Sequence, residues 1–360
     1  MSTLGSIFRR KDGRWCAKYR DMRGRTRYLY GKTKKEVRDK LGDALTARDK
    51  ERTDPLYEGD SLSVGAYLDR WLESTADTVS PRTYERTESI VRVHLKPTLG
   101  ATKLASLSPL EIQRLYREKL KEGLAPGSVR RIHITLHKAL HDAVRWHVLP
   151  HNVVSTVSPP KESGEEVKAL TIRETKQLFA AARGDRLEAL YVLAVTTGCR
   201  QGELLALRWD DLDLEARTLQ VKRTLWKGET YPPKTKKSRR TIALPDLAIE
   251  ALEQHRDKRL TDSPWVFTTR NKTPVNAYYL IGHSWKKMKA KAGLSASTRF
   301  HDLRHTCATL LLSKGVHPKV VQELLGHFSI SITLDTYSHV LPNMQEKAVR
   351  AMEDIFKDDG

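Results

Sequence analysis

Residues 299–315 read RFHDLRHTCATLLLSKG, and this stretch predicts a helix with two different faces. His301, Arg304 and His305 stand at i, i+3 and i+4, so they share one side of the helix, while leucines line the other. HDLRH is not the zinc-protease pattern H-E-x-x-H, because Asp302 takes the Glu position and Arg304 would put a cation inside the metal site. Histidine and arginine on one face suit an oxyanion or a phosphate instead.

The stretch TTGCRQGELLALRWDDLD, residues 196–213, places an arginine at a turn. Arg200 lies between Gly198 and Gly202, and glycines there let the backbone turn sharply before an apolar helical turn. The plain alternative is a surface arginine at a helix N-terminus. The helix dipole disfavours a cation at that end unless an anion accompanies it, so we interpret Arg200 as part of an anion site.

Residues 217–244 interrupt the helical pattern with three strand-like stretches, RTLQVKRTLW, KGETYPP and RRTIALP. They predict a small antiparallel sheet with KTKKS at a hairpin. A lysine on such a hairpin could reach into a site and donate a proton, but a plain basic loop has the same composition. The residues alone leave that choice open.

The segment GHFSISITLDTYSHV, residues 326–340, sets Tyr337 between His327 and His339. A helix that ends at Gly326 would expose His327 at its C-terminal end. A buried tyrosine is usually a packing residue, yet it becomes a nucleophile when a base takes its proton and cations stabilise the phenolate. Arginines, a lysine, histidines and one hydroxyl, without a carboxylate pair or metal cluster, suit phosphoryl transfer.

The composition indicates which phosphate is involved. The chain has 360 residues, with 64 Lys and Arg against 44 Asp and Glu, a formal charge of +20. Such an excess favours a nucleic acid as partner. No apolar run approaches the ~20 residues that span a bilayer, and no secretory h-region is visible, so a membrane role is disfavoured. Cys16, Cys199 and Cys307 are few and far apart, which fits reduced cytosolic thiols.

The N-terminal segment is the most basic part of the chain. Residues 1–40 hold fourteen Lys and Arg against four Asp and Glu. SIFRRK, RWCAKYRD and RTRYLYG read as three strands, and a capping box at Thr33 and Glu36 opens a helix behind them. Because cations alternate with aromatic residues, we favour DNA contact over a merely solvated basic sheet. The candidate DNA contacts are Arg9, Arg10, Arg14, Lys18, Arg20, Arg25 and Arg27.

Two polar stretches, 51–61 and 158–169, read as linkers. Four amphipathic patterns between them predict a compact helical domain. The expected fold class is multidomain and mainly α with small antiparallel β-sheets (α+β). The predicted domains are residues 1–55 (three strands plus a helix), 62–157 (helical) and 168–360 (mostly helical with a small sheet).

Three histidines of the helical domain could imitate a metal site. His133, His137 and His141 stand at i, i+4 and i+8. No acidic residue or cysteine clearly completes a ligand set, so we interpret them as a packed or surface stripe and expect no metal.

The third domain resembles the catalytic domain of the tyrosine recombinases, the phage-integrase family. The resemblance rests on TGCRQGELLALRW, the hairpin lysine, HDLRHTCAT, LLGH and the terminal tyrosine, in that order. The helical domain resembles the family's SAM-like core-binding domain. The basic N-terminal domain resembles the arm-type DNA-binding domain of the larger phage and transposon integrases.

The resemblance implies roles for individual residues. Tyr337 would attack the scissile phosphate and remain linked to the 3′ end. Arg200 and Arg304 would hold the non-bridging oxygens, His327 would be a further donor, and His301 would be the general base.

Two further roles follow from the same resemblance. The lysine that protonates the leaving 5′ oxygen is best matched by Lys234, with Lys236 and Lys237 as alternatives. Glu203 would orient the first arginine from behind the site, and His339 has no matching role and is expected to be structural.

The family reaction also implies partners. It needs no ATP, metal or other cofactor, because the phosphotyrosine link stores the phosphodiester energy. Double-stranded DNA with core-type and arm-type sites, a homotetramer on a four-way junction, a host DNA-bending protein and an excisionase are the expected partners, in the nucleoid-containing cytoplasm of a bacterium. We hypothesise that an amphipathic C-terminal helix in LPNMQEKAVRAMEDIF, with Met344, Ala348, Met352 and Ile355 on one side, docks on a neighbouring protomer.

Three other readings compete with an integrase. One is a resolvase of chromosome dimers, and another is a nicking enzyme similar to type IB topoisomerases. The extra basic N-terminal domain argues for an integrase that bridges two kinds of DNA site. The third is a non-catalytic DNA-binding protein descended from a recombinase, against which the intact residue set argues.

Overall fold

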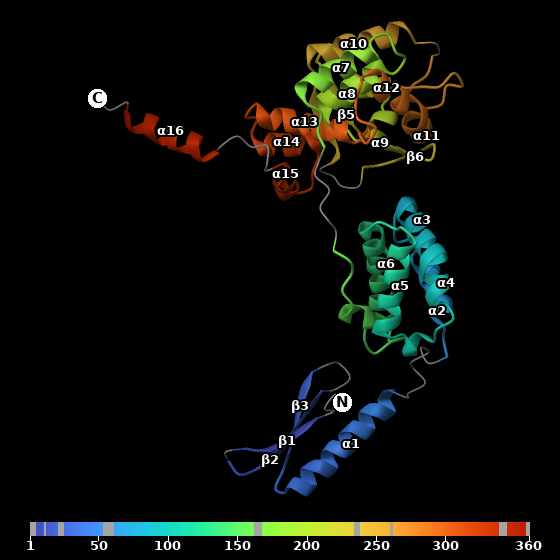
Figure 1. The fold of residues 1–360 in the computed structure, drawn as a ribbon, viewed down its shortest axis with the longest axis vertical. Helices are drawn as coiled ribbons and strands as arrows, with labels where there is room; N and C mark the ends of the chain where they lie inside the picture. The colour runs from blue at the N-terminus through green and yellow to red at the C-terminus, as the bar shows by residue number, and fades with distance from the viewer. Residues whose placement is uncertain are drawn as a thin grey trace. The chain divides into compact units, whose positions relative to one another are not determined.

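The structure is a computed structural model, and it describes most of the chain in two compact units, residues 1–164 and 165–360 (Figure 1). We call them the N-terminal and the C-terminal unit. No described helix is long and apolar enough to cross a membrane. The described residues are 5–10, 12–20, 25–52, 61–161, 168–233, 238–259, 262–337 and 344–357.

The N-terminal unit begins with the predicted sheet and helix. The strands pair antiparallel in the order β1-β2-β3, and α1 covers one face through Ala17, Val37 and Leu41. Glu36 N donates to the predicted cap Thr33 Oγ1 at 3.2 Å, while the Glu36 side chain accepts from Lys32 N at 2.8 Å, one residue before the Thr33 N–H that a full capping box uses. The elements are β1 (Ser6–Arg9), β2 (Trp15–Arg20), β3 (Thr26–Gly31) and α1 (Lys34–Arg52).

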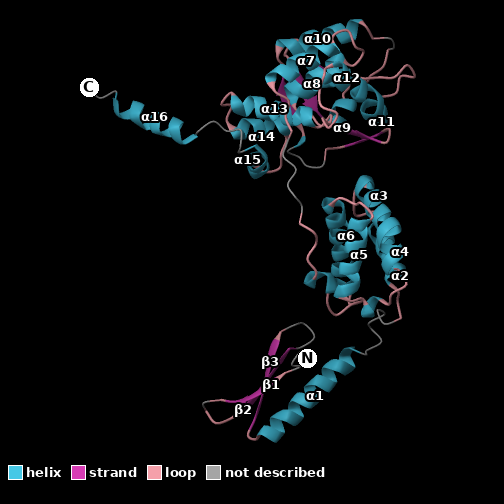
Figure 2. Cartoon of the chain, in the orientation of Figure 1, coloured by secondary structure: helices cyan, strands magenta, loops and turns pink. Residues whose placement is uncertain are grey.

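The predicted helical domain follows as a bundle with its own core (Figure 2). Ser63, Ser80 and Ser108 each cap a helix of the bundle, and Ser108 forms a full capping box with Glu111. The last long helix starts at Pro126, because proline suits the first helical turn. The elements are α2 (Val64–Thr75), α3 (Pro81–Ile90), the π-helical η2 (Val91–Leu95), α4 (Lys96–Leu99), α5 (Pro109–Lys121) and α6 (Pro126–Arg145).

The histidine stripe lies along α6. The ring centroids of successive histidines are 5.9 and 6.4 Å apart, and the rings stack. His133 Nδ1 is 2.9 Å from the Tyr116 hydroxyl, and His137 Nε2 is 3.2 Å from Ser155 Oγ. Stacking and these hydrogen bonds account for the stripe, and within the described residues no group of three potential ligands gathers around a metal position.

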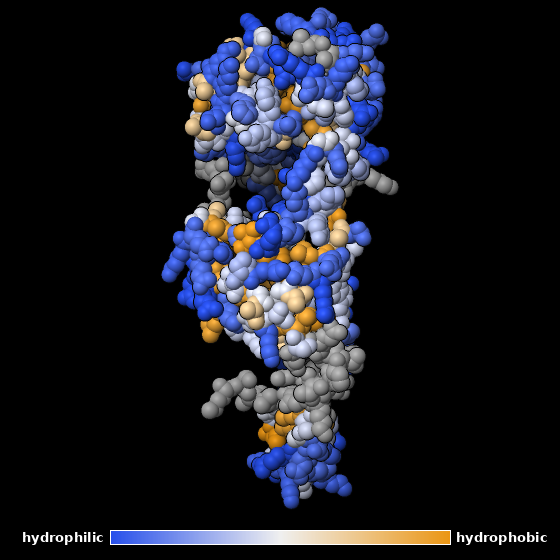
Figure 3. All heavy atoms as spheres, turned by 90° about the vertical axis from the view of Figure 1, so that its right-hand side faces the viewer, coloured by the Kyte–Doolittle hydropathy of each residue, from blue (hydrophilic) through white to orange (hydrophobic). Residues whose placement is uncertain are grey.

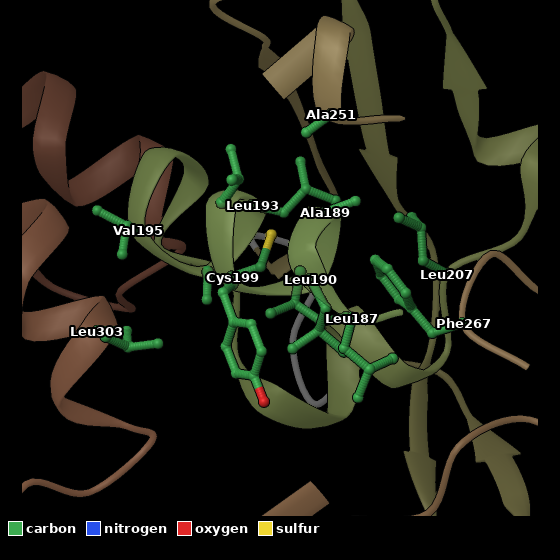
Figure 4. Packing of buried hydrophobic residues seen from close by; sticks show 14 of the residues in the cluster. Leu187, Ala189, Leu190, Leu193, Val195, Cys199, Leu207, Ala251, Phe267 and Leu303 are labelled. Carbon is green, nitrogen blue, oxygen red and sulfur yellow. The ribbon is translucent and has the colours of Figure 1, made fainter. Parts of the chain in front are cut away.

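The C-terminal unit is built around α8 (Glu188–Thr197), which is apolar on nearly all sides and is buried along most of its length. Figure 4 shows its side chains with Leu303 on one side and Leu207 and Phe267 on the other. Figure 3 shows mainly hydrophilic side chains on one outer face of this unit. The remaining helices are α7 (Ile172–Ala182), α9 (Gln201–Leu205), α10 (Asp246–Asp257), α11 (Ala277–Tyr279), the π-helical η7 (Leu280–Trp285), α12 (Lys286–Lys291), α13 (Asp302–Ser313), α14 (Pro318–Leu325), α15 (Ile330–Tyr337) and α16 (Met344–Lys357).

Strands do occupy residues 217–244, but the expected single sheet was wrong. The structure has a sheet of order β4-β5-β8 and a separate pair β6-β7. KTKKS therefore comes between β7 and β8, which pair in different sheets, and its residues 234–237 lie outside the described part of the structure. Pro232 and Pro233 follow β7 and lack backbone N–H donors, so β7 cannot extend into a ladder with β8. The strands are β4 (Leu212–Asp213), β5 (Thr218–Val221), β6 (Thr224–Trp226), β7 (Glu229–Tyr231) and β8 (Arg240–Ala243).

The predicted C-terminal helix is present as α16. Among its described side chains, Val349, Met352, Ile355 and Phe356 are all exposed. Met352 and Ile355 belong to the apolar face expected from the sequence. The side chains of Met344 and Ala348, which complete that expected face, lie outside the described part of the structure.

Candidate active site

Arg200 stands at the turn that the sequence predicts. Gly198 ends α8 in the left-handed region with φ of 60°, and Arg200 is the N-cap of α9. A Cβ at Gly198 would come within 2.5 Å of Leu325 Cδ2, so glycine is required both for the turn and for packing. The expected anionic partner is present, since Arg200 Nη1 donates to Glu203 Oε1 at 2.8 Å.

Arg304 is buried on α13, and its guanidinium points towards the turn that precedes Arg200. Its side chain donates through Nη1 to the Gly198 carbonyl oxygen at 2.7 Å, while Nη2 is buried without an acceptor among the described residues. Burial, and next the charge of Arg200, lower the pKa of Arg304 to about 10, so the guanidinium is still charged at pH 7. A buried cation with an unused N–H is costly unless an anion binds there.

Glu203 joins two arginines beneath the site. Besides Arg200, it accepts from Arg240 Nη2 at 3.0 Å, and both side chains of that pair are almost fully buried. Burial alone would raise the pKa of Glu203, but the charge and hydrogen bonds of Arg240, and then of Arg200, hold it below its usual range. Arg240 Nε also donates to the Leu324 carbonyl oxygen at 2.6 Å, so it ties β8 to α14.

Replacing Arg240 with methionine should destabilise the protein by about 3–5 kcal/mol at neutral pH, because the buried carboxylate of Glu203 loses its best partner. Since the pKa of Glu203 lies below its ordinary value of 4.5, the ion pair stabilises the fold above that pH and ceases to do so as the pH falls through the folded-state pKa. Denaturant unfolding of both proteins at pH 7 and pH 3.5 tests this. The exposed neighbour Arg239→Met is the control, and an equal loss of stability at both pH values would contradict the assignment.

His327 is placed by the end of α14. Gly326 caps that helix with φ of 66°, and its carbonyl oxygen accepts from Arg200 Nη2 at 3.1 Å. The imidazole Nδ1 lies 2.8 Å from Thr333 Oγ1. Burial, followed by the charges of Arg304 and Arg200, lowers the pKa of His327 to about 3, so the ring is neutral at pH 7.

Tyr337, the last residue of α15, is only 1% exposed. Burial raises the pKa of its hydroxyl to about 12, while the charge of Arg304 opposes that rise. The hydroxyl lies 2.6 Å from Nδ1 of His305, a residue that the sequence places on the right helix face without a role. His301 is exposed at the start of α13, and its ring stands perpendicular to that of His305 at 5.0 Å.

The structure brings five of the predicted catalytic residues, and Glu203 behind them, into one region of the C-terminal unit. The two arginines reach across to each other's segments, Arg304 to Gly198 and Arg200 to Gly326. Lys234, Lys236, Lys237 and His339 lie outside the described residues. The sequence did not identify Arg240 or Thr333, because RRTIALP offers two arginines and Thr333 sits among several similar residues.

The seven basic candidates of the N-terminal unit are all exposed, but they do not share one face. In the strand register, Lys18 and Arg20 point to the face of the sheet opposite α1, together with the exposed rings of Phe8, Tyr28 and Tyr30. Arg9 and Arg27 point to the opposite face of the sheet, the one that α1 covers. Arg14 forms a two-point contact with Asp12, with Nη2 at 2.8 Å, and Arg10 lies over the Tyr30 ring at 5.5 Å.

Comparison with known proteins identifies the group to which these features belong. The family model described as "Phage integrase family" matches residues 168–344, and "Phage integrase, N-terminal SAM-like domain" matches residues 63–120. A "Tyrosine recombinase XerC-like" protein of Caldanaerobacter subterraneus subsp. tengcongensis is 31% identical and covers 91% of each chain. An "Integrase" of Streptomyces ambofaciens is 30% identical over 91% of this chain and 88% of its own.

Solved structures agree on the fold. The Tn1549 transposon integrase in complex with a circular intermediate DNA has a TM-score of 0.71 at 22% identity, over 82% of this chain and 99% of its own. A lambda integrase tetramer bound to a Holliday junction has a TM-score of 0.62 at 22% identity, over 92% of this chain and 98% of its own.

Proposed function

Because the chain belongs to the phage integrase family and is a tyrosine-type site-specific recombinase that acts on DNA, we propose that Tyr337 is its nucleophile. The observation that carries this proposal is the buried Nη2 of Arg304, which has no acceptor among the described residues and lies in a region of cations around one phenol. A phosphodiester would supply the missing acceptor and bring its phosphorus to the hydroxyl.

The strand-transfer step follows from these groups. The Tyr337 oxygen attacks the scissile phosphorus, the bond to the 5′ oxygen breaks, and a 3′-phosphotyrosyl link forms. Arg200 and Arg304 neutralise the charge that grows on the non-bridging oxygens, with His327 as a neutral donor. Lys234 protonates the leaving oxygen, with Lys236 and Lys237 as alternatives, and His301 acts as the general base. Attack by a 5′ hydroxyl of the partner strand reverses the step, so no external energy source is needed.

The test is the covalent intermediate itself. Incubation of the full chain, without metal or nucleotide, with a duplex that carries the recombination site and a nick beside the cleavage position should give a denaturation-resistant protein–DNA band. Digestion and mass spectrometry should place the DNA on the peptide that contains Tyr337. Specific binding without any such band would favour the non-catalytic DNA-binding protein instead.

We further propose three functional domains at residues 1–55, 62–157 and 168–360, the first of which binds arm-type DNA sites. The face that carries Lys18 and Arg20 combines cations with exposed aromatic rings. This extra sheet favours an integrase of a phage or mobile element over a chromosome-dimer resolvase.

The double variant Lys18→Gln/Arg20→Gln should weaken binding of the full chain to arm-type DNA and lower the slope of log K against log salt by about two, one for each lost phosphate contact. Cleavage of the nicked core duplex should stay unchanged. The control is Lys35→Gln/Arg38→Gln, which removes the same charge from exposed positions on α1. If both double variants change the arm-type DNA affinity and the salt slope equally, the sheet contributes only general electrostatic attraction and the proposal is contradicted.

We also propose that four copies assemble on a four-way junction, as in the lambda integrase structure, with α16 docking on a neighbouring protomer. The exposed Val349, Met352 and Phe356 would supply the apolar contact. Deleting residues 342–360 should then leave dimers or monomers on junction DNA in sedimentation, and an unchanged tetramer would refute the docking role.

A host DNA-bending protein and an excisionase, in a bacterial cytoplasm, would set the direction of recombination, integration or excision. Adding each protein to a recombination assay tests this.

A further inference from the structure

The hydroxyl of Tyr337 is held by a residue that the family resemblance left without a role. His305 Nδ1 lies 2.6 Å from the Tyr337 hydroxyl oxygen, and the ring centroids are 5.8 Å apart. Among the described residues, this is the only hydrogen bond that the hydroxyl makes. His301, the expected general base, makes no hydrogen bond to it in the described structure and instead packs perpendicular to His305.

The direction of this hydrogen bond follows from the two groups. Burial, and next the charge of His301, lowers the pKa of His305 to about 4, whereas burial raises the pKa of Tyr337 to about 12. Both side chains are therefore neutral at pH 7, and the phenol keeps its proton. The hydroxyl has no other acceptor in the described structure, so it donates to Nδ1, and the imidazole carries its hydrogen on Nε2. The lone pairs of the phenol oxygen are then free for attack.

The position of His305 in the chain makes this bond useful. His305 directly follows Arg304 on α13, whereas Tyr337 belongs to α15. The hydrogen bond thus positions the Tyr337 hydroxyl relative to the turn of α13 that carries the Arg304 guanidinium, although Tyr337 lies on a separate helix. Fixing a reacting atom in this way is worth a large factor in rate, because misplacement by about 1 Å can cost on the order of a hundredfold.

We propose that His305 is a positioning residue: its Nδ1 orients the Tyr337 hydroxyl towards the phosphate that Arg304 holds. This inference rests on the proposed function, since it assumes that Tyr337 is the nucleophile. It differs from the general-base role given to His301: His305 orients the hydroxyl before the reaction, and the proton that the phenol loses as its oxygen attacks still goes to His301.

Three variants of the full chain separate orientation from packing and from proton transfer. His305→Asn keeps a polar atom near the position of Nδ1 but loses the ring and any useful basicity. His305→Phe keeps the ring and loses the polar atom, and His305→Ala loses both. The readout is the single-turnover rate of covalent adduct formation on the nicked duplex at saturating DNA, together with the DNA concentration that gives half the maximal rate.

We expect His305→Phe and His305→Ala to react about ten- to a hundredfold more slowly, with an unchanged half-saturating DNA concentration, and His305→Asn to recover most of the rate. A faster His305→Phe than His305→Asn would show that the ring only packs, and equal slowing of all three would indicate a base; either overturns the proposal. Thermal unfolding of each variant identifies rate losses that come from misfolding. If the wild type forms no adduct, the proposed function itself fails, whereas a reactive wild type without recovery by asparagine rejects only the role of His305.

Discussion

Replacing Tyr337 with phenylalanine should abolish the covalent protein–DNA adduct and all recombination, while DNA binding should persist. The substitution removes one oxygen from a side chain that packs with Ala308, Leu312, Val321 and Leu325. That apolar cluster keeps its ring, and the main loss is the hydrogen bond to His305, so the fold should survive. The hydroxyl of Thr333 is engaged with His327.

The measurement compares wild type and Tyr337→Phe on the nicked duplex under denaturing conditions, with binding followed separately by mobility shift. Tyr231→Phe is the matched control, because it removes a hydroxyl that contacts only Glu229 in the described structure. An adduct that persists in Tyr337→Phe would move the nucleophile elsewhere and would reject the mechanism proposed above.

Arg304→Lys should lower the single-turnover cleavage rate by about 10²–10³-fold, although the positive charge is kept. The guanidinium uses Nη1 for the Gly198 carbonyl oxygen and still has Nη2 for the phosphate. A lysine ammonium has no such fork and cannot serve both acceptors with the same geometry. The loss should fall mainly on the rate, since DNA affinity comes mostly from contacts elsewhere along the duplex.

A comparison at equal charge isolates this effect. Arg183→Lys makes the same exchange at an exposed position and should leave the cleavage rate unchanged. If Arg304→Lys cleaves at nearly the wild-type rate, a point charge is sufficient, and the interpretation of the buried Nη2 as a phosphate donor is wrong.

Much of this site could be predicted from the sequence because its residues lie in short local patterns. Arg200 could be placed at a helix start from its flanking glycines, and the side shared by Arg304 and His305 follows from helical spacing. The partners of these residues could not be found in this way. Arg240 and Glu203 lie 37 positions apart, and His305 and Tyr337 lie 32 apart, so their pairing depends on how β8 and α15 pack.

The misjudged sheet has a similar physical origin. Alternation along residues 217–244 indicates strands, but it does not say which strands pair, and the backbone donors removed by Pro232 and Pro233 decide that. The role of Lys234 remains a prediction, as does the choice among the three lysines, because all of them lie outside the described residues.

The hydrogen bonds by which each arginine contacts the other's segment have a practical consequence for attempts to change the DNA site that the protein recognises. Arg200 reaches Gly326 and Arg304 reaches Gly198, so each half of the candidate site is aligned by the backbone of the other half, and all four residues lie within the unit of residues 165–360. An engineered chimaera should therefore keep this alignment only if both halves of the candidate site come from the same parent protein. Exchanging residues 1–164 for those of another integrase respects that alignment, whereas a graft with a junction between Gly198 and Gly326 would separate groups that were fitted to each other.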